Sequence, residues 1–293
     1  MIKKLINFQS ISLFTLCITI FILVIIPFLL LIGFTLTGWD LTVPGSLKFN
    51  GLDNYKQILS DHQIWSAAIK TLIATFVPTI IQVIFGVSFA LILWEMVIGK
   101  DVFRTVLLIP MVIPPTIAGL IWKLLYYPKI GGISFMLEKM GFGTMELLSN
   151  PKYAFWAILV VSTWQMIPFV MLLSLAALES LSNDIFEAAK IDGVTYTQKI
   201  KYIVLPLIKD TVITAFLFRI IENVKIFPYV FSMTQGGPGT STQDLTFYTY
   251  TEGFRYYKFG YSSTIAVFTL LIVAIISIGA LKLRYQASRE VTE

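Results

Sequence analysis

Long apolar stretches alternate with short polar segments along most of this chain. Six stretches reach or exceed the roughly 20 residues that an α-helix needs to cross the hydrocarbon core of a bilayer. They lie at about residues 11–37, 67–98, 103–127, 153–178, 207–233 and 261–284. This pattern predicts an all-α integral membrane protein with six transmembrane helices, whose outer surface contacts lipid.

The composition agrees with a chain that folds in a membrane. Of the 293 residues, 56% are hydrophobic and 13% are charged, and the mean hydropathy is +0.79, whereas soluble domains carry about 25% charged residues. A single cysteine, Cys17, and a single histidine, His62, exclude an internal disulfide and a zinc site built from several such ligands. The net charge is +5, but the basic residues lie where a membrane protein needs them. We therefore expect no nucleic-acid partner.

The distribution of Lys and Arg predicts the orientation. If the N-terminus is cytoplasmic, the segments 1–10, 99–102, 179–206 and 285–293, with the adjoining helix edges, carry ten basic residues. The longer external segments, 38–66, 128–152 and 234–260, carry seven. The first apolar run is too long for a signal peptide and lacks a cleavage site, so we expect it to be retained as a helix. Both termini are thus predicted to be cytoplasmic.

The segment 179–206 is longer than a simple turn between two spans requires. Asn183 or Asp184 is suited to cap a helix, and Asp192-Gly193 would end it. A second helical stretch is expected from Thr195 to Val204, ending at Pro206. Two short helices outside the bilayer fit either a docking element for a cytoplasmic partner or an interfacial helix lying on lipid headgroups.

Fixed spacings in this segment carry a family resemblance. Glu187-Ala188-Ala189, then Gly193, then Ile203-Val204-Leu205-Pro206 resembles the EAA loop of the membrane subunits of bacterial ABC importers that use a solute-binding protein. A second motif, Gly236-Gly237-Pro238-Gly239 outside span five, is similar to the carbohydrate-importer branch, which includes maltose-type and multiple-sugar permeases. The resemblance implies that the residues coupling transport to the ATPase are Glu187, Ala188, Ala189, Asp192 and Gly193.

The same resemblance implies the partners and the location. The family pairs two homologous permease subunits with two ATPase subunits in the bacterial inner membrane, and an extracytoplasmic sugar-binding protein delivers the solute. ATP and Mg²⁺ would then be bound by the partner subunits, with no cofactor in this chain. The residues agree, because Gly33 and Gly38 have the spacing of a phosphate loop but Trp39-Asp40 follows in place of Lys-Ser/Thr. We therefore do not expect an enzyme.

Charged residues inside span five are the main candidates for a solute pathway. Arg219, Glu222 and Lys225 are spaced three apart, so the carboxylate can lie between two cations and neutralise Arg219. Intramembrane charges usually face a cavity or a partner, although a purely structural network is the alternative. Resemblance to maltose-type permeases implies that the solute-contacting positions, with Glu222 in support, are Arg219, Asn223, Ser162, Gln165, Met166 and Phe169.

The predicted organisation has three parts: residues 1–66 form the first helix and external loop, 67–284 the core permease with the coupling loop 183–206, and 285–293 a cytoplasmic tail. The predicted function is uptake of a sugar or oligosaccharide. The alternative is the same architecture importing a polyol, a glycerol-phosphate-type solute or an acidic sugar. A membrane enzyme would need a nucleophile–base or paired-carboxylate site, and a self-gating channel would leave the long cytoplasmic loop without a purpose.

Overall fold

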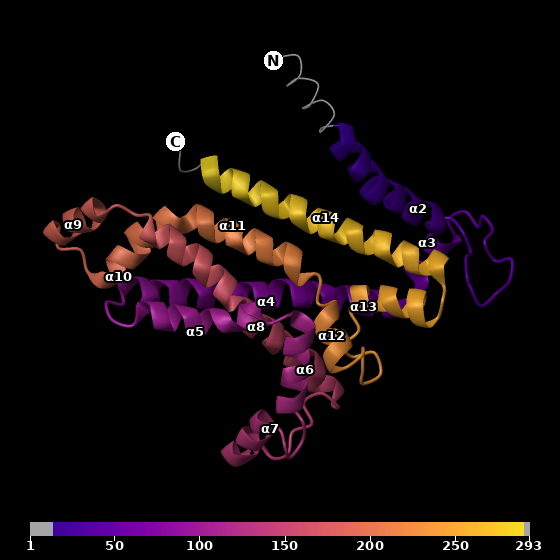
Figure 1. The fold of residues 1–293 in the computed structure, drawn as a ribbon, viewed down its shortest axis with the longest axis horizontal. Coiled ribbons are helices and arrows are strands. Elements are labelled where there is room, and N and C mark those ends of the chain that lie inside the picture. The colour runs from indigo at the N-terminus through magenta and orange to yellow at the C-terminus, as the bar shows by residue number, and fades with distance from the viewer. Residues whose placement is uncertain (1–13, 290–293) are drawn as a thin grey trace. The chain divides into compact units, whose positions relative to one another are not determined.

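The computed structural model describes residues 14–289, which form helices joined by short loops (Figure 1). The only β-type pairing among these residues is an isolated bridge between Thr37 and Phe49. The predicted cytoplasmic segment 1–10 and the last four residues of the predicted tail 285–293 lie outside the described residues. The helices are α2 (Ile26–Thr35), α3 (Asp53–Ser60), α4 (His62–Glu95), α5 (Lys100–Val112), α6 (Pro115–Leu125), α7 (Gly132–Leu137), α8 (Pro151–Glu179), α9 (Asn183–Ile191), α10 (Tyr196–Gln198), α11 (Leu205–Asn223), α12 (Phe227–Met233), α13 (Leu245–Tyr250) and α14 (Phe259–Arg289).

Four helical stretches of the described chain are long and apolar enough to cross a membrane. They are Phe14–Thr35, His62–Glu95, Pro151–Glu179 and Phe259–Gly279. Helices α5 and α6 make a fifth span if the bent pair is counted as one. The predicted span at 207–233 is absent from this set, because α11 carries four charged residues and the helix is interrupted before α12.

The predicted span at 103–127 is sharply broken rather than gently kinked. The axes of α5 and α6 meet at 97°. The break falls at Ile113, whose φ of −72° and ψ of 130° are extended, as expected of a residue that precedes proline. Pro114 and Pro115 then begin α6, where a missing N–H costs little. The bend leaves the carbonyl of Ile113 outside both helices.

The predicted span at 207–233 is also divided. Helix α11 ends at Asn223, and α12 begins at Phe227 with Pro228 in its first turn. At its other end α11 is continuous with the segment predicted to be cytoplasmic: the π-helical residues Lys199–Val204 lead directly into it. The expected stop at Pro206 is therefore wrong, because this proline lies in the first turn of α11 and continues the helical path.

Contacts divide the described chain into two units. The larger comprises Ser66–Phe247 and the described residues from Ile272 onward. Within it, α8 packs against α5 and α11, and α6 packs against α12. Close crossings depend on glycine, because a Cβ on Gly86 of α4 would lie 2.6 Å from Val170 Cβ and one on Gly119 of α6 would lie 2.0 Å from Ser232 Oγ. Small residues let membrane helices approach this closely.

The smaller unit comprises the described residues up to Trp65, together with Tyr248–Leu271. Asn54 of α3 is buried and its Nδ2 donates to the carbonyls of Thr35 and Thr37, both at 2.8 Å, which satisfies the end of α2. Asp61 precedes α4 and accepts hydrogen bonds from the hydroxyls of Tyr248 at 2.7 Å and Tyr261 at 2.6 Å. These bonds connect segments nearly 200 residues apart in sequence.

Candidate functional site

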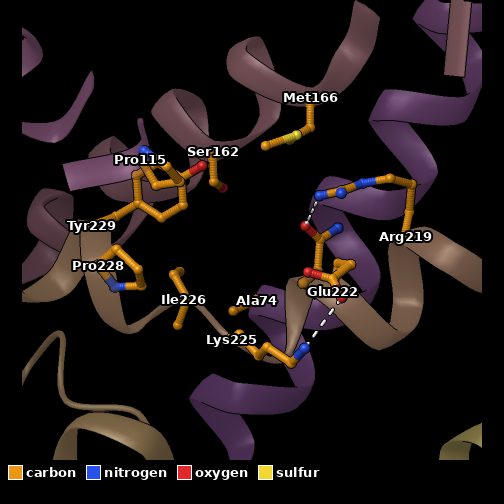
Figure 2. A pocket seen from close by; sticks show the side chains of 11 residues that line it. Ala74, Pro115, Ser162, Met166, Arg219, Glu222, Lys225, Ile226, Pro228 and Tyr229 are labelled. Atoms are coloured by element: carbon orange, nitrogen blue, oxygen red, sulfur yellow. Dashed lines mark hydrogen bonds and ion pairs between the residues drawn. The ribbon is translucent and has the colours of Figure 1, made fainter. Parts of the chain in front are cut away.

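A polar cavity lies where the two broken spans meet α8. Its volume is about 80 Å³. Figure 2 shows side chains from α4, α6, α8, α11 and α12 converging on it. The lining residues are Ala74, Pro115, Ser162, Met166, Arg219, Glu222, Asn223, Lys225, Ile226, Pro228 and Tyr229. Five of the seven predicted solute contacts are among them: Ser162, Met166, Arg219, Glu222 and Asn223.

The guanidinium of Arg219 is held by neutral amides. Arg219 is 6% exposed; its Nε donates to Gln82 Oε1 at 2.9 Å and its Nη2 donates to Asn223 Oδ1 at 2.5 Å. The ring of Phe169 lies 5.9 Å from the guanidinium carbon, within cation–π range. The expectation that Glu222 pairs with Arg219 is therefore wrong, since no ion pair joins them in the described structure.

Glu222 forms its ion pair with Lys225 instead, at 3.1 Å. Both side chains are more than half exposed in the single chain, at 54% and 66%. Lys225 lies beyond the end of α11, and its ammonium is linked to Glu222 while the guanidinium of Arg219 is linked to Asn223 (Figure 2). The predicted row of three alternating charges is thus split into a buried cation and a separate, accessible pair.

Two residues of α4, Gln82 and Thr79, complete the network around Arg219. Asn223 Nδ2 donates to Thr79 Oγ1 at 2.8 Å and to Gln82 Oε1 at 3.0 Å. Gln82 Nε2 donates to the carbonyl of Ser162 at 3.2 Å. Sequence analysis did not identify either residue, although an amide inside an apolar span is itself a signal of internal hydrogen bonding.

Gln165 and Phe169 do not line the cavity. Gln165 is fully buried, its Nε2 donates to the carbonyl of Ile113 and its Oε1 accepts from the hydroxyl of Tyr229 at 2.7 Å. This amide therefore joins α8 to the break between α5 and α6 and to α12. Phe169 lies behind Arg219, in edge contact with Phe218 at 6.4 Å between ring centroids. Both residues support the cavity wall in this conformation.

The segment 183–206 presents an exposed helix. Ser182 caps α9, since its side chain accepts from the N–H of Asp184 at 3.3 Å, so the cap is neither of the two residues expected. Glu187 and Ala188 are exposed, whereas Ala189 is buried. Ile191 is 86% exposed, which is unfavourable for an isolated chain in water. Gly193 has φ +70° and ends the helix.

The opposite side of this segment is fixed to the transmembrane helices. Lys199 pairs with Glu95 at the end of α4, at 2.8 Å. The ring of Phe186 lies 5.1 Å from that of Trp94, also on α4. Apolar packing continues into the cluster that includes Leu93, Leu178 and Val204. The exposed face of α9 is therefore held in a defined position relative to the spans.

The glycine-rich motif Gly236-Gly237-Pro238-Gly239 forms a tight turn. Gly236 and Gly239 have φ of +88° and +58°, which favour glycine. A Cβ on Gly236 would lie 2.6 Å from the ring of Phe247. Thr242 Oγ1 donates to the carbonyl of Gly237 at 2.9 Å and closes the turn. The loop is thus a packed unit whose backbone is held by its own side chains.

Comparison with known protein families decides what this architecture belongs to. A family model described as the inner membrane component of binding-protein-dependent transport systems matches residues 82–289. The chain belongs to this family. The match includes the cavity residues of α8 and α11 and the whole EAA segment. It confirms the family indicated by the Glu187-Ala188-Ala189 motif, and assigns the chain to membrane transport rather than to catalysis.

Individual relatives agree with this assignment. The chain is 36% identical over 252 residues to the probable ABC transporter permease protein y4oQ of Sinorhizobium fredii, covering 85% of this chain and 81% of that protein. It is 35% identical over 246 residues to the trehalose/maltose transport system permease protein MalF of Thermococcus litoralis, covering 83% and 82%. A crystal structure of a bacterial ABC transporter involved in alginate import has the same fold, with a TM-score of 0.82 at 20% identity, covering 97% and 96%.

Proposed function

We propose that this permease is one of two membrane subunits of an ABC importer for a sugar or oligosaccharide. An extracytoplasmic binding protein delivers the solute, a second homologous permease completes the pathway, and two ATPase subunits bind ATP and Mg²⁺. The similarity to a trehalose/maltose permease supports the solute class. The similarity in fold to an importer of alginate, an acidic polysaccharide, keeps acidic sugars as the second candidate.

The observation that carries this proposal is the cavity beside Arg219. Planar groups that donate and accept hydrogen bonds suit the adjacent hydroxyls of a sugar, and Arg219 and Asn223 supply them. The volume of about 80 Å³ is well below the roughly 300–1,000 Å³ of ligand pockets. Glu222 and Lys225 are exposed within a predicted span, and charges there normally face a cavity or partner. A second subunit would enlarge the cavity and cover this pair.

The residues are assigned roles from their positions. Arg219, Asn223 and Ser162 would hydrogen-bond the solute, with Met166 and the Glu222–Lys225 pair on the rest of the wall. Gln165 and Phe169 would act from behind the wall. The core permease, 67–284, would contain the whole pathway, with residues 1–66 and the tail 285–293 outside it.

We further propose six spans, with α5–α6 and α11–α12 each counting as one broken span, and with both termini in the cytoplasm. The segment 183–206, between spans four and five, would then dock on an ATPase. Its coupling residues would be Glu187, Ala188, Ala189, Asp192 and Gly193. Support comes from the exposed α9 face, its fixed base on α4 and the higher density of Lys and Arg in the same segments.

Orientation is testable with single cysteines, because Cys17 is the only native one. In a Cys17→Ser background, Asp192→Cys and Thr240→Cys place exposed thiols at the two predicted sides. A membrane-impermeant maleimide should label position 240 in spheroplasts and position 192 only after lysis. Labelling of position 192 in intact spheroplasts would reverse the proposed topology.

Transport is testable with the complex reconstituted in liposomes together with its binding protein. ATP hydrolysis and solute uptake are measured with maltose, trehalose, alginate oligosaccharides, glycerol 3-phosphate and a polyol. We expect a neutral sugar to stimulate ATP hydrolysis and to be taken up. Stimulation by alginate oligosaccharides alone would select the acidic-sugar alternative, and stimulation by glycerol 3-phosphate or the polyol alone would reject sugar transport.

A further inference from the structure

Helix α4 contributes only Ala74 to the cavity lining, but it carries a stripe of polar residues directly behind the wall. Thr71, Thr75, Thr79 and Gln82 are spaced four, four and three residues apart and are all completely buried. This spacing places them on one face of a helix with 3.6 residues per turn. Buried polar groups are costly unless they are hydrogen-bonded, so the partners of this stripe identify its role.

Gln82 uses both ends of its amide to connect α4 to two other helices. Its Oε1 accepts from Arg219 Nε at 2.9 Å and from Asn223 Nδ2 at 3.0 Å. Its Nε2 donates to the carbonyl of Ser162 at 3.2 Å. One side chain therefore contacts all three residues that we assign to hydrogen-bond the solute, without itself lining the cavity.

Thr79 fixes the orientation of the Asn223 amide. Its hydroxyl donates to the carbonyl of Thr75 at 2.6 Å, so its oxygen is left to accept from Asn223 Nδ2 at 2.8 Å. The Asn223 oxygen must then face Arg219, whose Nη2 donates to it at 2.5 Å. Of the five N–H groups of Arg219, two are engaged by these side chains, and three have no hydrogen-bond partner within the described chain.

We propose that Gln82 and Thr79 are positioning residues for the solute site. They do not touch the solute; they hold Arg219 and Asn223 so that the remaining donors of the guanidinium are presented to the cavity. The inference rests on the proposed function, because it requires that the cavity lie on the transport pathway. Helix α4 would thus influence solute binding indirectly, because its side chains contact the residues of the cavity wall and not the solute.

The stripe supplies its own matched control. Thr75 and Thr79 are both fully buried on the same face of α4, and each hydroxyl donates to a carbonyl four residues earlier. Only Thr79 also accepts from a cavity residue. Thr79→Val and Thr75→Val thus each remove one equivalent intrahelical hydrogen bond in similar surroundings. Only Thr79→Val also removes the hydrogen bond from Asn223.

The measurement is the amount of sugar transported per ATP hydrolysed in proteoliposomes, using the panel sugar that stimulates the complex most. Losing one hydrogen bond of about 0.5–1.5 kcal/mol corresponds to roughly a two- to tenfold effect. We expect Thr79→Val, which removes one hydrogen bond to Asn223, to lower the ratio by that amount. Gln82→Met removes three hydrogen bonds and should lower it at least as much, while Thr75→Val stays within about twofold of wild type. Thr79→Ser, which retains the hydroxyl, should restore the ratio. The apparent Tm should fall similarly in both threonine-to-valine variants.

The variant Asn223→Ala distinguishes a failure of the solute-site assignment from a failure of the positioning role of Gln82 and Thr79. If Asn223→Ala leaves the ratio unchanged, the cavity is not part of the pathway and both the site assignment and the positioning role are rejected. If Asn223→Ala lowers the ratio but Thr79→Val and Gln82→Met do not, the positioning role alone is overturned. An equal loss of transport in Thr79→Val and Thr75→Val would also overturn it, because the polar stripe would then act only through stability.

Discussion

Arg219 and Glu222 lie one helical turn apart on α11, yet the guanidinium of Arg219 donates to Gln82 and Asn223 while Glu222 pairs with Lys225. The buried cation is therefore stabilised by neutral oxygens, and the acidic residue faces the accessible side. Charge-assisted hydrogen bonds are stronger than those between neutral groups, which suits a site where the arginine keeps one orientation. This arrangement holds Arg219 in one orientation in the cavity wall and leaves the Glu222–Lys225 pair accessible.

We predict that Glu222→Gln changes transport without a large loss of folded complex. The Glu222–Lys225 pair is more than half exposed, and exposed ion pairs contribute about 0–1 kcal/mol. Arg219→Met should lower the yield of folded complex, because it leaves the buried Asn223 Oδ1 unpaired, at about 1–3 kcal/mol, and removes one of the two donors to Gln82 Oε1. Size-exclusion chromatography and apparent Tm of the detergent-solubilised complex measure both. A larger loss of stability in Glu222→Gln would contradict the observed pairing.

Sequence reasoning located the four long apolar helices of the described chain and the family motif, because both depend on local pattern. Hydropathy identified each long apolar helix, and the EAA spacing is contained within one segment. Prolines lie at the two breaks, but proline does not specify a bend of 97°, which depends on which donor reaches the free carbonyl of Ile113. That donor, the side-chain amide of Gln165, lies 52 residues away and has no local signature.

The partner of Arg219 could not be predicted for a similar reason. Spacing on one helix favours Glu222 at three residues and Asn223 at four almost equally. The choice is made by Gln82, which lies 137 residues earlier in the sequence. Hydropathy registers Gln82 only as a polar interruption in an apolar helix. Helix α4 packs closely against α8, where Gly86 lies next to Val170. In this packing Gln82 contacts both α8 and α11.

Gln165 is predicted to act through stability of the α5–α6 break. Gln165→Leu keeps the volume but removes the donor to Ile113 and the acceptor of Tyr229, which should cost about 1–3 kcal/mol for each buried group left unpaired. Tyr229→Phe is the control, because it removes only the hydroxyl contact. We expect apparent Tm to fall in both and further in Gln165→Leu. Equal values would show that the Ile113 carbonyl does not depend on Gln165.

Glu187→Gln is predicted to weaken ATP hydrolysis that depends on the binding protein, while the chain folds normally. Glu187 is exposed and has no ion-pair partner within the described residues, so its carboxylate is available to a basic group on an ATPase. Asp184→Asn, in the first turn of the same helix, is the control and should retain stimulation. Co-purification of the ATPase should be weaker with Glu187→Gln. Unchanged stimulation and co-purification in this variant would remove the assigned coupling role.

The last prediction concerns the hydrogen bonds to Asp61 in the smaller unit. Burial acts to raise the pKa of this carboxyl, but hydrogen bonds from Tyr261, Tyr248 and the N–H groups of Gln63 and Ile64 outweigh it and hold the pKa below its usual value of 3.8. The unfolded chain therefore binds a proton at higher pH than the folded chain does. The stability from Asp61 is complete above the unfolded pKa and is lost as pH falls through the lower, folded pKa.

Asp61→Asn should lower the apparent Tm of the purified complex at pH 7, and the difference from wild type should shrink as the pH falls below about 4. The comparison uses the difference in apparent Tm between wild type and Asp61→Asn, because a second carboxyl titrates in both proteins. Burial raises the pKa of that carboxyl, Glu252, which also interacts with Asp61. Asp53→Asn is the control, since Asp53 forms only an exposed ion pair with Lys56 at 3.0 Å. A gap between Asp61→Asn and wild type that widens with acidification would mean that the tyrosine hydroxyls favour the protonated carboxyl, contrary to the geometry of the two short hydrogen bonds.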